Sequence, residues 1–356
     1  MKGIHQILTS LTYGDAISDE ALEIMRIVKE QGLQSYIFSY YFHPKMAHLR
    51  YRKEDFFGMV SSDDILVFHF SIGSPISSLY LFSRQKKILI YHNITPYEYF
   101  IDYQRDLAKF TYLGRKELEK FAPVTDLGLG DSSFNREELE ASGYRKTGVL
   151  PVIRDFSKFD KAENVSIEKI YRNKKTTIIF VGRIIPNKKF EDLIRVFYLY
   201  KKMYNQNSQL ILIGEHGGFE RYYYSLLNLI EELKLKDVIF PGHVTFDELS
   251  SFYRISDLFL CLSEHEGFCV PILEAFYHRI PVIAFNSSAV SETMNGGGTL
   301  IENKDYEFIA CLIDVIINNE ELRDKIIKSQ DEAMEKYKME KLKNVFLGYI
   351  DIVENT

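Results

Sequence analysis

The segment from Ser263 to Phe276 has the sequence SEHEGFCVPILEAF and marks the passage from a strand to a helix. The apolar run that precedes it, LFLCL, is typical of a short buried strand. Pro271 suits the first turn of a helix, where the missing N–H would have no helical partner in any case. The first N–H groups of a helix lack intrahelical acceptors and lie at the positive end of the helix dipole. The sequence therefore predicts a loop over residues 267–270 that binds anions, phosphates above all.

Two carboxylates flank this loop. Glu266 stands directly before it, and Glu274 follows within the predicted helix. Ionised carboxylates accept hydrogen bonds from hydroxyl groups such as those of a sugar or a ribose. A phosphate-binding loop between two such acceptors predicts a site for a sugar nucleotide.

A second loop carries two cations. The segment VGRIIPNK ends a β-branched run with Gly182 and then supplies Arg183 and Lys188. A glycine at the end of a buried strand allows a ligand to approach the backbone. Two basic residues on one loop are by themselves more often a solvated turn. Because this loop comes one strand-helix system before the Glu266 loop, we expect both loops to hold a diphosphate from two directions.

The composition is that of a folded protein large enough for two domains. The chain has 356 residues, of which 46% are hydrophobic and 26% charged, and its formal net charge is -6. Interspersed charges with a negative sum argue against nucleic acid as a partner. The three cysteines, Cys261, Cys269 and Cys311, lack metal-site spacing, which favours reduced thiols in a cytoplasmic protein. We expect neither a signal peptide nor a membrane-spanning segment.

Short apolar runs alternate with helical patterns in both halves, which predicts an α/β protein with parallel sheets. We expect a first domain over residues 1–155 and a second over residues 165–338. The pattern weakens in the polar stretch Asp155 to Asn164, which we interpret as the linker. A long helix is predicted from Tyr97 to Phe121, and a last helix, about 339–356, is expected to pack back on the first domain.

Together these motifs resemble those of the retaining GT-B glycosyltransferases of family 4. The resemblance rests on the Glu-x7-Glu segment and the Gly-Arg-x4-Lys loop, and it covers nearly the whole chain. Further matching motifs are Gly14-Asp15-Ala16, His92-Asn93-Ile94-Thr95-Pro96, Asp131-Ser132-x-Phe134-Asn135, Gly214 and Gly242-His243-Val244. The resemblance implies two Rossmann-like, doubly wound domains facing a central cleft, the first for the acceptor and the second for the donor.

The resemblance also implies roles for individual residues. Arg183 and Lys188 would contact the donor diphosphate, and Glu266 would bind the hydroxyls of the donor sugar. His92, from the first domain, would lie over that sugar, and Glu274 would hold the ribose. The remaining residues expected at the donor are Gly14, Asp15, Gly182, Gly214, His243, Val244, Gly267, Phe268, Cys269 and Val270.

Some of these residues have an equally good structural interpretation. Asp15 either orients the acceptor or caps the next helix, and His243 is either a base contact or a turn residue. His265 is expected to be solvated. The pair Asp63-Asp64 lacks the Asp-x-Asp spacing of a metal-binding glycosyltransferase, and a solvated turn is the better interpretation. We therefore expect no metal and no cofactor.

The acceptor half of the chain is harder to interpret. The region His43 to Lys53 is basic with interleaved aromatic residues. It is either a patch that contacts anionic lipid headgroups at the inner face of the cell membrane or a solvated loop.

The expected function is transfer of a hexose, with retention, from a nucleotide-diphosphate sugar to a saccharide or lipid-linked acceptor in cell-surface polysaccharide synthesis. The resemblance is greatest to polysaccharide and O-antigen mannosyl- or rhamnosyltransferases, which makes a GDP-linked donor the first expectation and a UDP-linked one the second. The alternatives are a phosphorylase or epimerase of the same fold, or a non-catalytic subunit that binds nucleotide sugars. A pyridoxal-phosphate phosphorylase would need a longer chain and a Schiff-base lysine.

Overall fold

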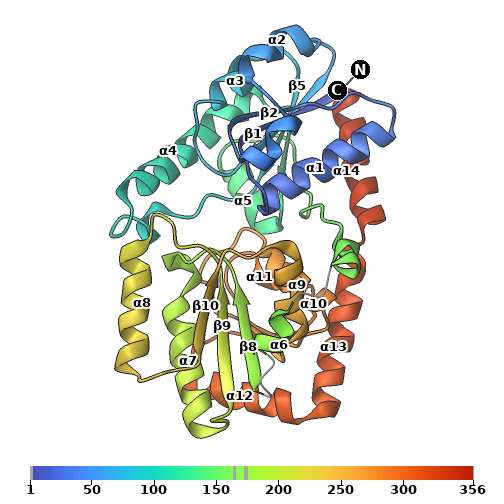
Figure 1. The fold of residues 1–356 in the computed structure, drawn as a ribbon. Helices are drawn as coiled ribbons and strands as arrows, with labels where there is room; N and C mark the ends of the chain where they lie inside the picture. Colours follow the sequence, from blue (N-terminus) through green and yellow to red (C-terminus); the bar gives the residue numbers. More distant parts are fainter. Residues whose placement is uncertain (1–2, 163–165, 172–174, 356) are drawn as a thin grey trace. The chain divides into compact units, whose positions relative to one another are not determined.

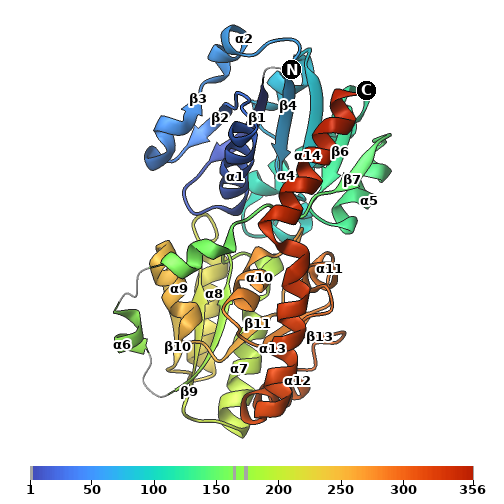
Figure 2. The same cartoon turned by 90° about the vertical axis from the view of Figure 1, so that its right-hand side faces the viewer.

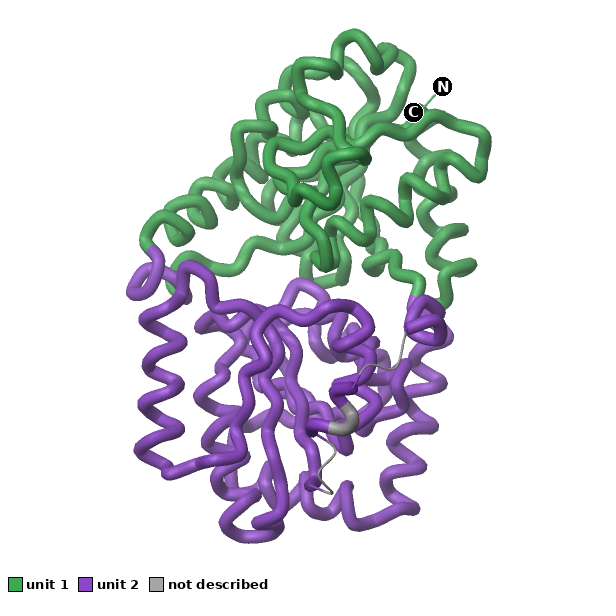
Figure 3. Tube along the Cα trace, in the orientation of Figure 1, with its two compact units in different colours: residues 1–98, 105–155, 336–356 green, residues 99–104, 156–335 purple. Residues whose placement is uncertain are grey.

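The computed structural model describes residues 3–162, 166–171 and 175–355. Within these ranges the chain divides into two compact units (Figure 3). The first unit comprises Met1–Glu98, Arg105–Asp155 and Lys336–Thr356, and the second comprises Tyr99–Gln104 and Phe156–Glu335. The predicted domain boundary at residue 165, the last two residues of the predicted linker and the chain ends at 1–2 and 356 lie outside the described residues.

A parallel sheet of seven strands forms the centre of the first unit (Figure 1). Its strand order is β3-β2-β1-β4-β5-β6-β7, and every pairing is parallel. The strands are β1 (Ile4–Leu11), β2 (Ile37–Phe42), β3 (Arg50–Tyr51), β4 (Ile65–Phe70), β5 (Lys86–Tyr91), β6 (Leu127–Gly130) and β7 (Thr147–Val149). The helices are α1 (Ala16–Glu30), α2 (Phe56–Met59), α3 (Ser77–Phe82), α4 (Arg105–Phe121), α5 (Ser133–Ala141) and α14 (Met339–Glu354).

Alternate residues of the strands bury side chains on both faces of this sheet. In β4, for example, Phe68 belongs to the cluster on one face, while Val67 belongs to the cluster on the other. The second cluster includes residues of α14, so the C-terminal helix completes the core of the first unit (Figure 2). Lys343 of α14 also forms an ion pair with Glu30 at the end of α1, at 3.0 Å.

The second unit repeats this architecture with six parallel strands in the order β10-β9-β8-β11-β12-β13. The strands are β8 (Thr176–Val181), β9 (Ser208–Ile213), β10 (Val238–Gly242), β11 (Leu258–Cys261), β12 (Val282–Phe285) and β13 (Thr299–Ile301). The helices are α6 (Ile167–Tyr171), α7 (Phe190–Met203), α8 (Glu220–Glu232), α9 (Phe246–Arg254), α10 (Val270–Tyr277), α11 (Val290–Met294), α12 (Tyr306–Asn318) and α13 (Glu320–Met334).

Each sheet reverses its winding direction at one point. In the first unit the reversal lies between the adjacent strands β1 and β4, and in the second between β8 and β11. Connections on either side of such a point leave toward opposite directions, which opens a crevice at the carboxyl ends of the two strands. These two places are therefore where each unit is expected to bind a ligand.

Three expectations about local structure need correction. The long helix begins at Arg105 and not at Tyr97, because residues 97–99 form a separate 3₁₀ turn. Strands β6 and β7 were not expected, since they are short and contain glycine. Asp64 is not solvated: it is buried, and it accepts hydrogen bonds from the backbone N–H groups of Gly3 and Ser61. Among the described helices, none has both the length and the apolar character needed to cross a membrane.

Candidate functional site

The winding reversal of the second unit brings the two predicted loops together. Lys188 ends a 3₁₀ turn after β8, and Glu266 follows β11. Because β8 and β11 are adjacent parallel strands, their carboxyl ends meet at the same edge of the sheet. The loops also share backbone contacts, since the N–H of Glu264 donates to the carbonyl of Asn187 at 2.8 Å.

Lys188 and Glu266 form a largely buried ion pair. The ammonium Nζ lies 2.5 Å from Oε2 of the carboxylate, and the two side chains are 17% and 6% exposed. Burial lowers the pKa of Lys188, but the neighbouring Glu266 outweighs this effect and the pKa is raised overall. The lysine is therefore cationic at neutral pH. The other carboxylate oxygen, Oε1, is buried and has no hydrogen-bond partner in the described structure.

The loop after Glu266 leads into α10 as the sequence predicted. The helix begins at Val270, with Pro271 in its first turn. Cys269 caps it in the left-handed backbone region, at φ 72° and ψ 62°, a conformation that favours glycine. A hydrogen bond fixes the backbone of this loop: the hydroxyl of Thr293 donates to the carbonyl of Phe268. The structure thus positions residues 267–270 at a helix N-terminus, where anions are favoured.

His265 was expected to be solvated, but it is buried. Its carbonyl accepts a hydrogen bond from the side chain of Asn187 at 3.0 Å, which links the Glu266 loop to the Lys188 turn. Its ring lies 6.3 Å from that of Tyr99, a residue of the second unit. The backbone of His265 therefore helps to hold the two loops together.

Glu274 lies within α10 and is buried. Its Oε2 accepts a hydrogen bond from the hydroxyl of Tyr253 at 2.8 Å. Tyr253, on α9, was not predicted as part of the site. A tyrosine near a predicted site gives no signal in the sequence unless the packing of the two helices is known.

Gly214 follows strand β9, and the backbone of Gly182 approaches it closely. A Cβ on Gly214 would lie 2.0 Å from the carbonyl oxygen of Gly182, and φ of Gly214 is +153°. Arg183, which follows Gly182, donates to the carbonyl of Gly217 at 3.0 Å and lies over the ring of Phe219.

The segment after β10 is more open. His243 is 53% exposed and its Nδ1 lies 3.7 Å from Glu215, while Val244 is half-buried. Gly242 has a positive φ of 77°. This geometry is that of a turn, and the predicted contact of this segment with a nucleobase stays a prediction.

In the first unit, His92 belongs to a buried cluster at the carboxyl ends of the central strands. Its Nδ1 lies 2.9 Å from Oδ2 of Asp131 and 3.7 Å from Oε2 of Glu20. Its Nε2 lies 2.9 Å from Nδ1 of His69, whose Nε2 in turn lies 2.9 Å from Oε1 of Gln6. The predicted position of His92 over a donor sugar stays a prediction.

Burial and neighbouring charges determine the protonation state of each group in this cluster. Burial lowers the pKa of His92, but Asp131 and Glu20 outweigh it and raise it to about 9. Burial keeps the pKa of His69 well below its usual value, so His69 is neutral. The cationic His92 then donates from Nε2 to His69, and His69 donates from its own Nε2 to Gln6. Burial raises the pKa of Glu20 to about 8, so this carboxyl is protonated at neutral pH.

Glu20, His69 and Asp131 were not predicted as parts of a site. Glu20 could have been noticed, because it lies one turn before Ile24 on the apolar face of α1. A carboxylate on such a face is unusual and indicates a buried partner. Asp131 had been identified only as part of a motif.

A small pocket adjoins this cluster. It has a volume of about 190 Å³ and lies where β1 and β4 end, at the winding reversal of the first sheet. Hydroxyl groups line it together with Asp15 and His69; the lining residues are Leu8, Thr9, Ser10, Thr12, Asp15, Ile17, His69, Ser71 and Ile72. Asp15 also caps α1 by accepting from the N–H and the hydroxyl of Ser18. Gly14 precedes it with φ of 75°.

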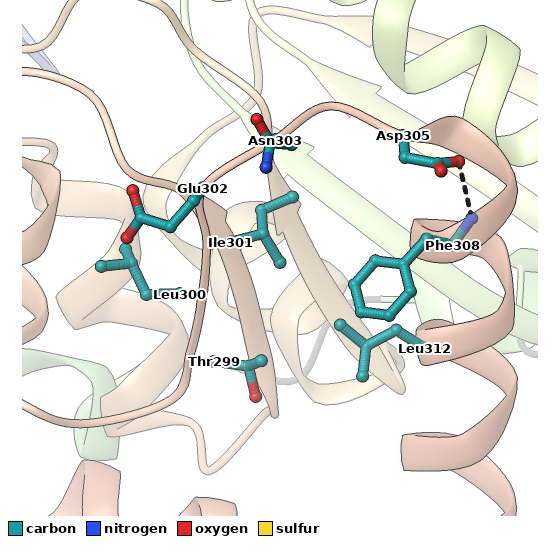
Figure 4. Close-up of a pocket in the computed structure, with 8 residues that line it drawn as sticks. All are labelled: Thr299, Leu300, Ile301, Glu302, Asn303, Asp305, Phe308 and Leu312. Atoms are coloured by element: carbon teal, nitrogen blue, oxygen red, sulfur yellow. Dashed lines mark hydrogen bonds between the residues drawn. The ribbon is translucent and has the colours of Figure 1, made fainter.

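A second pocket, of about 450 Å³, lies between β13 and α12 (Figure 4). Its lining combines apolar side chains with two carboxylates, Glu302 and Asp305, and contains no cation. Asp305 is engaged as the cap of α12, accepting from the N–H of Phe308 at 3.0 Å. Such a lining does not suit a diphosphate, and none of the predicted site residues belongs to it.

The predicted site residues of the second unit all fall within one recognisable sequence domain. Residues 162–333 match the family described as Glycosyl transferases group 1. The matched segment contains both loops, Glu274 and the winding reversal of the second sheet. The family description and the names of the relatives support a transferase.

Several curated proteins match parts of the chain. The capsular polysaccharide biosynthesis glycosyltransferase CapM of Staphylococcus aureus is 31% identical over 180 residues, which cover 48% of this chain and 45% of that protein. The GDP-mannose-dependent alpha-(1-6)-phosphatidylinositol monomannoside mannosyltransferase of Mycobacterium tuberculosis is 27% identical over 214 residues, covering 56% and 54%. The chain thus spans about half the length of the curated relatives it matches.

Solved structures resemble the whole chain. Anabaena Alr3699/HepE, crystallised in complex with UDP and glucose, aligns over 98% of this chain and 99% of its own with a TM-score of 0.75 and 15% identity. A glycosyltransferase from Rickettsia africae aligns over 99% and 98% with a TM-score of 0.74 and 17% identity. At these identities the likeness shows the fold, and the predicted GT-B class is confirmed.

Proposed function

We propose that this protein is a retaining glycosyltransferase that moves a hexose from a nucleotide-diphosphate sugar to a saccharide or lipid-linked acceptor in cell-surface polysaccharide synthesis. The observation that carries the proposal is the Lys188–Glu266 pair. It lies at the winding reversal of a group 1 glycosyltransferase domain, beside the N-terminus of α10. A cation and a helix N-terminus suit a phosphate, and the adjacent carboxylate suits the hydroxyls of a sugar.

The chemistry needs groups that stabilise the leaving phosphate. Cleavage of the bond between the sugar and the diphosphate develops negative charge on the diphosphate, which preorganised cations and N–H groups can stabilise. Arg183, Lys188 and the N-terminus of α10 supply this stabilisation, so the reaction requires no metal ion. Glu266 binds hydroxyls of the donor sugar, and Glu274 binds the ribose.

Retention arises from attack of the acceptor on the face that the diphosphate leaves, with the departing phosphate taking the acceptor proton. In this proposal no carboxylate of the site serves as a covalent nucleophile. Kinetic isotope effects or mass spectrometry that revealed a covalent glycosyl-enzyme would contradict this mechanism.

The donor is proposed to be GDP-linked, with mannose or rhamnose as the sugar. The name of the mycobacterial relative supports this choice, whereas the Anabaena structure holds UDP. A UDP-linked sugar is the second choice.

The acceptor is proposed to enter the small pocket at the end of β1 and β4. Its hydroxyl-rich lining and the carboxylate of Asp15 can exchange hydrogen bonds with saccharide hydroxyls. The neighbouring segment His43 to Lys53 carries exposed basic side chains, and Tyr41, Phe42 and Tyr51 are exposed beside it or within it. We propose that this region contacts anionic lipids, which would locate the enzyme at the inner face of the membrane.

A thermal-shift panel of GDP, UDP, ADP and dTDP, each with and without EDTA, tests the donor and the metal independence together. A ligand at 100 times its Kd stabilises the fold by about 2.7 kcal/mol. We expect GDP to raise the Tm most, and EDTA to leave the shift unchanged.

Transfer assays with the corresponding sugar nucleotides test catalysis. Lys188→Ala and Glu266→Ala should abolish transfer, while the matched control Lys189→Ala, which changes the adjacent lysine, should retain it. If either of the first two variants kept full activity, the site would be wrong. Binding of the nucleotide without transfer to any saccharide would favour a non-catalytic subunit.

A further inference from the structure

Two of the three cysteines lie next to the proposed donor carboxylate. Cys261 ends strand β11, and Cys269 caps α10 after the Glu266 loop, so the chain folds back to bring the two thiols together. One sulfur from each cysteine and one carboxylate oxygen of Glu266 all lie within 4.8 Å of one another. All three residues are buried.

This separation is close to that of a metal site. In tetrahedral zinc sites the metal–sulfur bond is about 2.3 Å, which places two sulfur ligands about 3.8 Å apart. The three atoms therefore need to move by only about 1 Å or less to share one ion. The exposed third cysteine, Cys311, is not part of this group.

A second observation indicates that Glu266 can accept a ligand. Oε1 of Glu266 is buried and has no hydrogen-bond partner in the described structure, although buried carboxylate oxygens are rarely left unpaired. The other oxygen of this carboxylate is held by Lys188, and the sulfur of Cys261 lies 3.5 Å from the hydroxyl of Ser263. Metal ligands in proteins are commonly oriented by such outer contacts.

The charges also balance. As ligands the two cysteines are thiolates, and with Glu266 they carry three negative charges against the one positive charge of Lys188. A divalent cation brings the sum of this buried group to zero, which low-dielectric surroundings favour. Thiolate ligands select soft ions such as Zn²⁺ and Cd²⁺ over Mg²⁺.

We propose that Cys261, Cys269 and Glu266 form a binding site for a thiophilic divalent cation such as Zn²⁺, and that its occupation inhibits the enzyme. A metal bound by Glu266 withdraws this carboxylate from the donor sugar. The inhibition rests on the function proposed above, whereas the binding does not.

Cobalt binding tests the site without reference to activity. Titration of the fully reduced protein with Co²⁺ should produce a thiolate-to-cobalt charge-transfer band that saturates at one equivalent and is abolished by Zn²⁺. Cys261→Ala and Cys269→Gly should lose the band and weaken binding by about 100-fold or more. Glycine suits the left-handed backbone at position 269, so that variant should fold. The matched control Cys311→Ala should bind like the unaltered protein.

Absence of the band in the reduced unaltered protein would overturn the proposal, as would its persistence in both Cys261→Ala and Cys269→Gly. In transfer assays, one equivalent of Zn²⁺ should inhibit the unaltered protein and Cys311→Ala but not Cys261→Ala. If the metal-free protein transfers no sugar at all, the proposed function fails, and the cobalt band still decides whether the metal site exists.

Discussion

Replacing Lys188 with methionine keeps the length of the side chain and removes the cation from its pair with Glu266. We expect this change to destabilise the fold as well as to abolish transfer. The carboxylate would stay buried, and within the described residues its Oε1 already lacks a partner while its Oε2 is bound by Lys188. The ionised Glu266 would then lack the ammonium of Lys188, whose attraction offsets the cost of removing the carboxylate from water.

The size of the effect follows from the burial of the pair. Removing one partner of a buried ion pair costs about 3–5 kcal/mol. Lys188 is 17% exposed and Glu266 6%, so some water reaches the pair and we expect the lower end, about 3 kcal/mol. In the double variant Lys188→Met with Glu266→Gln no charge is stranded, and the loss should fall to about 1 kcal/mol. The double variant should therefore be about 2 kcal/mol more stable than Lys188→Met.

Urea unfolding followed by circular dichroism measures these differences as shifts in the midpoint. Lys189→Met is the matched control, because Lys189 pairs with Glu264 near the surface and such pairs contribute about 1 kcal/mol or less. If Lys188→Met were no less stable than this control, or if the double variant were no more stable than Lys188→Met, the ion pair would not have the energetic role assigned to it.

Three further predictions concern other parts of the chain. The contribution of His92 to stability is fully present below about pH 6.5 and is lost as the pH rises through its folded pKa of about 9. The raised pKa of Glu20, about 8, also makes the fold less stable as the pH rises. The urea midpoint should therefore fall as the pH rises from about 6.5 to 9, and Glu20→Gln should make this fall smaller. Gly214→Ala should cost about 2–4 kcal/mol in chemical denaturation, because its Cβ meets backbone, whereas Gly217→Ala, which meets nothing, should be nearly neutral. Tyr253→Phe removes the hydrogen bond to Glu274 and should cost about 1.5–3 kcal/mol of stability. A Tm equal to that of the unaltered protein would contradict this contact.

The sequence drew attention to the two loops at the second winding reversal because each follows an apolar strand and carries charges that such strands lack. It could not show that Lys188 pairs with Glu266, since the two residues are far apart in the chain and meet only because β8 and β11 are neighbours in the sheet. The same limit applies to the contact between Cys261 and Cys269. Neighbouring strands are not necessarily consecutive, so the order within a sheet has to come from the fold.

The sequence also did not reveal which charged residues are buried. Charged residues are mostly exposed, so a pattern-based interpretation assigns them to the surface. That rule failed for Glu20, Asp64 and Asp131, which are all nearly inaccessible. It failed for a physical reason: each has a hydrogen-bonding partner that lies elsewhere in the sequence, such as the N–H of Ile153 for Glu20 and that of Gly3 for Asp64.

At each of the two winding reversals, the charged groups of that unit largely neutralise one another. The cluster around His92 sums to zero when His92 is cationic, Asp131 ionised and Glu20 protonated. Lys188 is likewise neutralised by Glu266. Within the described residues, Arg183 has no carboxylate at ion-pair distance, and its guanidinium donates to the backbone carbonyl of Gly217. For the proposed function we therefore predict that Arg183 and the N-terminus of α10 attract the diphosphate first, and that Lys188 contributes when the donor sugar draws Glu266 into its hydrogen bonds.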